Sequence, residues 1–91
     1  RDLNLRIDEV GVPPDSSATG RTLEEVRPGG GSNALLLAVR TGDGEWIYNP
    51  PPSHEIRAGQ GLVFLGSPSD ARTVRDRVDG ERIASSDPGG A

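Results

Sequence analysis

The chain has 91 residues, with no cysteine, no methionine and three aromatic side chains, Trp46, Tyr48 and Phe64. This length allows one domain with one modest core, and the absence of cysteine excludes disulfides, zinc–thiolate sites and thiol catalysis. Fourteen acidic against ten basic residues give a net charge of −4, which argues against a nucleic-acid-binding surface.

Alternating apolar residues predict a first strand near the start of the chain. Leu3, Leu5 and Ile7 alternate with a period of two, and the phase then changes to Val10 and Val12. This change of phase predicts a bulge or kink around positions 8 and 9. The prolines at positions 13 and 14 end the strand, because proline cannot donate to a ladder.

A short helix is predicted after the polar loop that follows. Thr22 and Glu25 have the spacing of a capping box, in which each side chain satisfies the other residue's free backbone N–H group. Arg27, Pro28 and the Gly29–Gly31 run then end the helix within about two turns.

The strongest strand signal is the apolar run Ala34–Val39, which is far shorter than the ~20 residues of a membrane-spanning helix. A continuous apolar run of this length predicts a central strand that is buried on both faces. Gly42–Gly44 predicts a turn, and Glu45–Asn49 is the expected hairpin partner. Pro50–Pro52 then forces an extended segment without ladder hydrogen bonds.

The last third of the chain predicts one more strand and one more helix. Leu62–Leu65 has the pattern of a second buried strand. Ser67 as N-cap and Pro68 at the first helical position begin a helix that we expect to end at Gly80. Residues 85–91 are expected to form a disordered tail. The predicted fold is therefore α+β, with a small sheet of about four strands and two helices in the order β-α-β-β-β-α, in one domain over residues 1–84.

The sequence gives little support for a catalytic site. His54 is the only histidine, so a triad would need a serine and a carboxylate gathered around its proline-flanked loop. The acid pairs at positions 8–9 and 24–25 are adjacent in sequence and point apart, so neither makes a metal or acid–base site alone. We therefore expect no enzyme, no catalytic residue, no metal site and no bound cofactor.

Two residues are better candidates for binding. Arg27 lies at the end of the predicted helix, directly before the glycine run, and Asn33 begins the strand on its other side. An arginine can bind a phosphate, and an amide can bind the edge of a base. Equally, Arg27 fits a contact with the helix C-terminus and Asn33 fits an ordinary turn, and spacing alone leaves both interpretations open.

Four motifs in chain order resemble one known family. Gly20–Arg27 and the strand Asn33–Arg40 resemble the pattern G-(K/R)-T-L-x-E-L-R followed by a hydrophobic strand. Gly42–Pro52 resembles a G-D-G-x-x-x-x-N-P hairpin, and Ile56–Gly66 resembles L-x-x-G-D-x-L-x-x-x-G. These patterns are similar to the C-terminal lobe of regulator-of-K⁺-conductance domains, also called the TrkA C-terminal domain, over residues 7–79. Gln60 departs from the aspartate that is usual in the family and would cap the turn, so we expect a change in local stability there.

The resemblance implies a cytoplasmic regulatory domain of a potassium channel, K⁺ transporter or cation/proton antiporter, held at the inner face of the membrane by its partner or parent chain. It also implies a homodimer with a small-molecule effector and no nucleic-acid partner. Family members that sense cyclic di-AMP hold it across the dimer two-fold. The matching positions here are Val26, Arg27, Asn33, Ala34, Pro50 and Pro52. The alternatives are a ligand-free dimerisation module and a cation-sensing lobe with acids such as Asp43 and Glu45.

Two further expectations come from the residues themselves. All ten basic residues are arginines, a bias that indicates a GC-rich bacterial genome. The predicted hairpin carries Trp46, Ile47 and Tyr48, and joining two copies would cover this apolar surface. The chain also begins without methionine or a signal sequence, and we expect it to be a piece of a longer protein.

Overall fold

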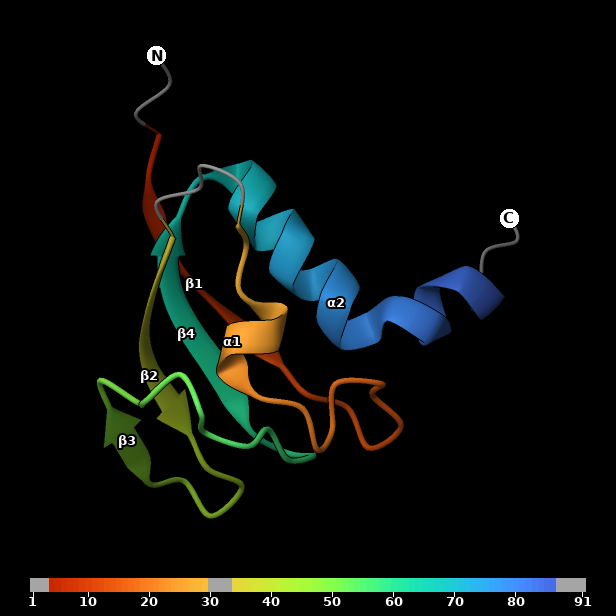
Figure 1. Ribbon diagram of the computed structural model, residues 1–91, viewed down its shortest axis with the longest axis horizontal. Coiled ribbons are helices and arrows are strands. Elements are labelled where there is room, and N and C mark those ends of the chain that lie inside the picture. The colour runs from red at the N-terminus through yellow and green to blue at the C-terminus, as the bar shows by residue number, and fades with distance from the viewer. Residues whose placement is uncertain (1–3, 30–33, 87–91) are drawn as a thin grey trace.

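The computed structural model describes residues 4–29 and 34–86, with side chains as far as residue 79. Within these residues it has one antiparallel sheet, in the order β1-β4-β2-β3, and two helices (Figure 1). The elements are β1 (Arg6–Gly11), α1 (Leu23–Val26), β2 (Leu35–Arg40), β3 (Trp46–Tyr48), β4 (Gly61–Gly66) and α2 (Pro68–Ser86). The α+β class and the order β-α-β-β-β-α are confirmed.

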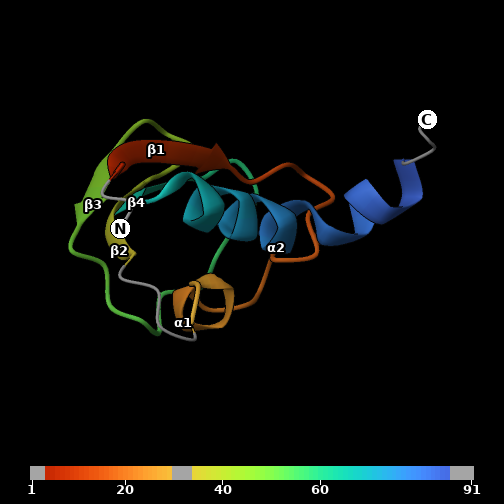
Figure 2. The ribbon, with the colours of Figure 1, turned by 90° about the horizontal axis from the view of Figure 1, so that it is seen from above.

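One face of the sheet forms the core. Val10, Leu62, Val39 and Ile47 pair in a row across all four strands, and Phe64 lies in the neighbouring row with no exposed surface. Both helices lie on this side of the curved sheet (Figure 2), with α2 packed on β1 and β4 and in contact with α1. They add five buried apolar side chains: Leu23, Val26, Ala71, Val74 and Val78.

The change of apolar phase in β1 has a cause other than a bulge. β1 pairs with β4 without interruption from Arg6 to Gly11, so the predicted bulge at positions 8 and 9 is wrong. Ile7 faces away from the helices and is 64% exposed, whereas Val10 faces the core and is 4% exposed. The two apolar sets therefore belong to opposite faces of one regular strand. A register shift occurs in β2 instead, between Leu36 and Ala38.

The face opposite the helices is open to solvent in the described part of the chain. Leu35 of β2 lies on it beside Leu65 and is 55% exposed, so the expectation that this strand is buried on both faces is wrong. The apolar composition of a strand does not show whether other elements of the same chain cover both of its faces. We call this surface the open face; its exposed large apolar residues are Leu5, Ile7, Leu35, Trp46 and Tyr48.

Helix α2 begins as predicted and ends later. Ser67 Oγ accepts from the Asp70 N–H group at 3.2 Å, and Asp70 Oδ2 accepts from the Ser67 N–H group at 3.0 Å. The helix then continues through Gly80 to Ser86, because one internal glycine costs only about 1 kcal/mol and helix-forming residues follow it. The predicted end is wrong, the first two residues of the predicted tail are helical, and positions 87–91 lie outside the described residues. Neither described helix is long and apolar enough to cross a membrane.

Candidate functional site

A pocket of about 220 Å³ lies between α1, the start of β2 and the segment that follows β3. Four of the six predicted ligand residues line it together: Arg27, Ala34, Pro50 and Pro52. The remaining lining residues are Leu23, Glu24, Leu35, Leu36 and Asn49. Three segments that are far apart in sequence thus meet around one cation and a mostly apolar wall.

The other two predicted residues are not part of this lining. Val26 is 2% exposed and packs in the core, because the apolar side of the short helix α1 faces the sheet while Arg27 follows at the helix end. The structure therefore does not bring Val26 to the pocket. Asn33 lies outside the described residues.

Backbone hydrogen bonds hold the walls of the pocket together. The Leu23 N–H group donates to the His54 carbonyl at 3.1 Å, and the Glu24 N–H group donates to the Pro52 carbonyl at 3.0 Å. These are N–H groups at a helix start, which have no partner inside the helix. On the other side the Asn49 N–H group donates to the Leu37 carbonyl at 2.9 Å. The proline segment is therefore fixed to both α1 and β2.

Arg27 is the cation of the pocket. Its Nη1 lies 3.2 Å from Glu24 Oε1, and its side chain remains 44% exposed. A guanidinium has five N–H donors in a planar fork, so the bond to Glu24 leaves donors with which it can bind a phosphate. The Arg27 carbonyl accepts from Arg77 Nη1 at 2.6 Å, which joins the end of α1 to α2.

Glu25 has a structural role that its neighbour Glu24 does not share. The Thr22 N–H group donates to Glu25 Oε1 at 2.9 Å, as the capping-box spacing predicted. This hydrogen bond, helped by the charge of Arg21, holds the pKa of Glu25 below its ordinary value. Glu25 thus stabilises the start of α1, and Glu24 is the acid of the pocket.

Asn49 is a lining residue that the sequence analysis missed. Its φ of 50° lies in the left-handed region, which asparagine tolerates better than most residues. Its exposed side chain stands beside Pro50 in the pocket wall. A residue before proline usually has extended backbone, so the Asn–Pro pair in the sequence did not predict this geometry.

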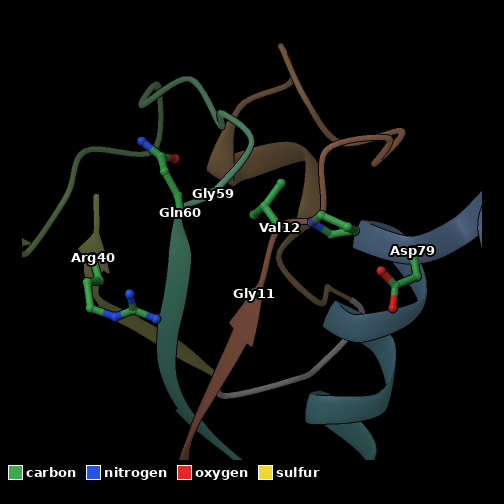
Figure 3. A pocket seen from close by; sticks show the side chains of 7 residues that line it. Gly11, Val12, Arg40, Gly59, Gln60 and Asp79 are labelled. Carbon is green, nitrogen blue, oxygen red and sulfur yellow. The ribbon is translucent and has the colours of Figure 1, made fainter. Parts of the chain in front are cut away.

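A second pocket, of about 330 Å³, lies where β1 ends and β4 begins (Figure 3). Arg40 and Asp79 stand on opposite sides of it. Arg40 donates to Glu9, and Gln60 Oε1 accepts from the Arg57 N–H group at 3.0 Å. Gln60 therefore caps the turn in place of the usual aspartate. We take the smaller pocket as the candidate site, because four of the six predicted ligand residues line it.

The described residues contain no set of side chains that could bind a metal ion. No three histidine, aspartate or glutamate side chains are grouped there as a metal ion requires. Asp43 and Glu45 are exposed in the turn between β2 and β3, without a third such group. This arrangement does not favour the cation-sensing alternative.

Comparisons with known proteins give a family and a fold. The family model of the TrkA-C domain matches residues 8–79. No curated protein matches the sequence. Two solved structures, "GsuK Channel" and "GsuK channel bound to NAD", are each 19% identical and cover 85% of this chain, with TM-scores of 0.63 and 0.64. A third, "S. agalactiae BusR in complex with its busA-promotor DNA", is 24% identical over 88% of this chain, with a TM-score of 0.58.

These similar proteins are much longer than the region that they share with this chain. The matched region is 14% of each GsuK chain and 38% of the BusR chain. At these identities the likeness establishes the fold alone.

Proposed function

Because this chain belongs to the TrkA-C domain family, we propose that it is a cytoplasmic regulatory domain of a potassium channel, K⁺ transporter or cation/proton antiporter. We propose further that it binds cyclic di-AMP as a homodimer and catalyses no reaction. The observation that carries this proposal is the pocket in which Arg27, Ala34, Pro50 and Pro52 meet. The fold shared with the structures named as GsuK channels supports the role in potassium transport.

The chemistry of the pocket suits one half of a cyclic dinucleotide. Arg27 offers a planar fork to a phosphate, and Ala34, Pro50 and Pro52 offer dry surface to a base. Asn49 can donate to and accept from the edge of an adenine. All of these groups line the same pocket, so one nucleotide unit can lie against them.

The size of the pocket favours a ligand shared by two copies. Its volume of about 220 Å³ is below the ~300–1,000 Å³ of complete small-molecule sites. Cyclic di-AMP has two equal halves, and two copies related by a two-fold axis would each supply one pocket. The homodimer is therefore part of the proposed binding mode.

The negative charges of the chain oppose the binding of a dianionic ligand, and Arg27 is the group of the pocket that favours it. The chain carries a net charge of −4, and Glu24 shares the pocket with Arg27. Binding must therefore depend on a local contact between Arg27 and the phosphate. The same net charge leads us to propose no nucleic-acid partner for this chain, although the similar structure of BusR is a complex with DNA.

A thermal-melting screen of the full chain tests the proposal. The ligands are cyclic di-AMP, adenine nucleotides, Ca²⁺ and Mg²⁺, and we expect cyclic di-AMP to stabilise the fold. The gain is about 2.7 kcal/mol at a hundredfold excess over Kd. Arg27→Ala should lose this shift, and Arg72→Ala, which removes an exposed arginine of α2 outside the pocket lining, should keep it. An absent shift for the parent, or an equal shift for Arg27→Ala, would contradict the site. Absence of any ligand response would favour the ligand-free dimerisation module.

A further inference from the structure

The end of α1 carries the cation of the candidate pocket. Arg27 is the residue that caps this end, and Pro28 and Gly29 follow it. A helix of four residues is too short to be stable alone, and glycine places few limits on the backbone. The position of the Arg27 guanidinium therefore depends on what holds the end of α1 to the rest of the domain.

The two ends of α1 are held in different ways. At its start, the N–H groups of Leu23 and Glu24 donate to carbonyl groups of the segment that follows β3. At its end, the Arg27 N–H group donates to the Leu23 carbonyl at 3.0 Å, within the helix itself. The Arg27 carbonyl accepts from Arg77 Nη1 of α2 at 2.6 Å. Among the described residues, this bond is the one that joins the polar backbone groups of Arg27 to another element.

Arg77 is not itself part of the pocket. Its side chain is exposed on α2 and does not line the cavity, so its effect on a ligand there passes through Arg27. A binding group contributes fully only when it is held within about 0.5 Å of its productive position. Holding the Arg27 backbone also reduces the conformational freedom that ligand binding must remove.

The part of α2 that includes Arg77 is fixed on its other side as well. Ser16 Oγ donates to the Val78 carbonyl, and Ser16 is 8% exposed. The Ala18 N–H group donates to the same Ser16 Oγ at 2.9 Å, and the Val78 side chain has no exposed surface. Arg77 therefore stands on a part of α2 that the loop after β1 and the core hold in place.

We propose that Arg77 is a positioning residue of the candidate pocket: its hydrogen bond fixes the end of α1 and so presents Arg27 to an anionic group of the ligand. The inference rests on the proposed function and adds a residue outside the pocket that sets its affinity. The coupling is reciprocal, so a ligand that immobilises Arg27 also strengthens the contact between α1 and α2. A movement of α2 that draws Arg77 away from Arg27 weakens binding.

Three variants of the 91-residue chain, titrated with cyclic di-AMP, test this role. Arg77→Ala should raise Kd about three- to tenfold, as for the loss of one hydrogen bond. Arg77→Lys keeps a charged donor and should recover most of the affinity, because the contact uses a single guanidinium nitrogen. Arg75→Ala removes an exposed arginine two positions away, on another face of the helix, and should bind like the parent.

Hydrogen exchange of the Arg27 N–H group in the ligand-free chain, followed by NMR, separates anchoring from charge. Loss of a positive charge by itself slows exchange that hydroxide catalyses. Loss of the anchor instead opens the hydrogen bond from Arg27 to the Leu23 carbonyl and accelerates exchange. Arg77→Ala should therefore accelerate the exchange severalfold, and Arg75→Ala should leave it unchanged.

The outcomes distinguish this inference from the proposed function. Weaker binding by Arg77→Ala without faster exchange would mean that Arg77 acts through its charge, and would overturn the positioning role. Equal affinities for Arg77→Ala and a parent that binds would overturn the inference and leave the proposed function intact. If the parent binds no cyclic di-AMP, the proposed function falls and the inference falls with it.

Discussion

Glu24 is the side chain that most directly opposes an anion in the candidate pocket, because its carboxylate holds Arg27 at 3.2 Å. Exposed ion pairs of this kind are worth about 0.2–1 kcal/mol. Glu24→Gln should therefore free the guanidinium and tighten cyclic di-AMP binding by up to about fivefold. Calorimetry at low salt measures the change. Glu45→Gln removes a charge from an exposed turn outside the pocket lining and serves as the control. Weaker binding by Glu24→Gln would mean that Glu24 contacts or orients the ligand instead.

Asn49 combines an unusual backbone with a place in the pocket wall, and two substitutions separate these properties. Asn49→Gly keeps the left-handed conformation at φ of 50° and removes the side chain. It should weaken ligand binding severalfold with little change in stability. Asn49→Ala should in addition lower the free energy of unfolding by about 1 kcal/mol. Urea unfolding and calorimetry on both variants check this. Equal ligand affinity for parent and Asn49→Gly would exclude a role for the side chain in binding.

Glu25 gives the fold a pH dependence. Its pKa is lowered in the folded state, mainly by the hydrogen bond from the Thr22 N–H group. A lowered pKa stabilises the fold above the ordinary pKa of a glutamate, about 4.3, and this contribution disappears as the pH falls below that value. Urea unfolding between pH 6 and 3 should show a smaller loss of stability for Glu25→Gln than for the parent. Parallel curves for the two proteins would contradict this role.

At the scale of elements, β1 shows that the sheet is covered on one side only. Val10 is 4% exposed and Ile7 is 64% exposed on the same strand. Val10→Ala should cost about 2 kcal/mol of unfolding free energy, whereas Ile7→Ala should stay within about 0.5 kcal/mol. The measurement is denaturant unfolding at concentrations where the chain is monomeric. Similar losses for both variants would mean that the open face is packed within one chain.

The order of elements follows from local signals, and this is why it could be predicted. The Thr22–Glu25 spacing starts α1, Ser67 and Pro68 start α2, and the glycine turns separate the strands. The predictions of the bulge in β1 and of the end of α2 failed, because both depend on tertiary context. The phase change in β1 could mean a bulge or a change of face, and only the placement of the helices decides between them. The end of α2 was missed because Gly80 can stop a helix or remain inside one.

The candidate pocket was predicted in part for the same reason. Arg27, Ala34, Pro50 and Pro52 sit in motifs that resemble the family, and the fold brings them together. Val26 lies in the core and not in the pocket lining, because the helix of four residues turns its apolar side to the sheet. Asn49 could not be found, since its backbone conformation follows from the attachment of the proline segment to β2.

In the whole molecule, the pocket and the open face meet at Leu35. This residue lines the pocket and is 55% exposed on the open face. A ligand in the pocket would therefore lie at the edge of the open face. In the proposed function, ligand binding and dimerisation strengthen each other, because a ligand that binds only the dimer shifts the equilibrium toward it.

Isothermal titration of the 91-residue chain with cyclic di-AMP measures both the affinity of the pocket and the number of chains per ligand. We expect saturation at one ligand for two chains, and loss of at least tenfold in affinity for Arg27→Ala, as for a charged phosphate contact of about 1.5–3 kcal/mol. Arg72→Ala should titrate like the parent. No heat at tens of micromolar, saturation at one ligand per chain, or unchanged binding by Arg27→Ala would overturn the proposed binding of cyclic di-AMP between two copies.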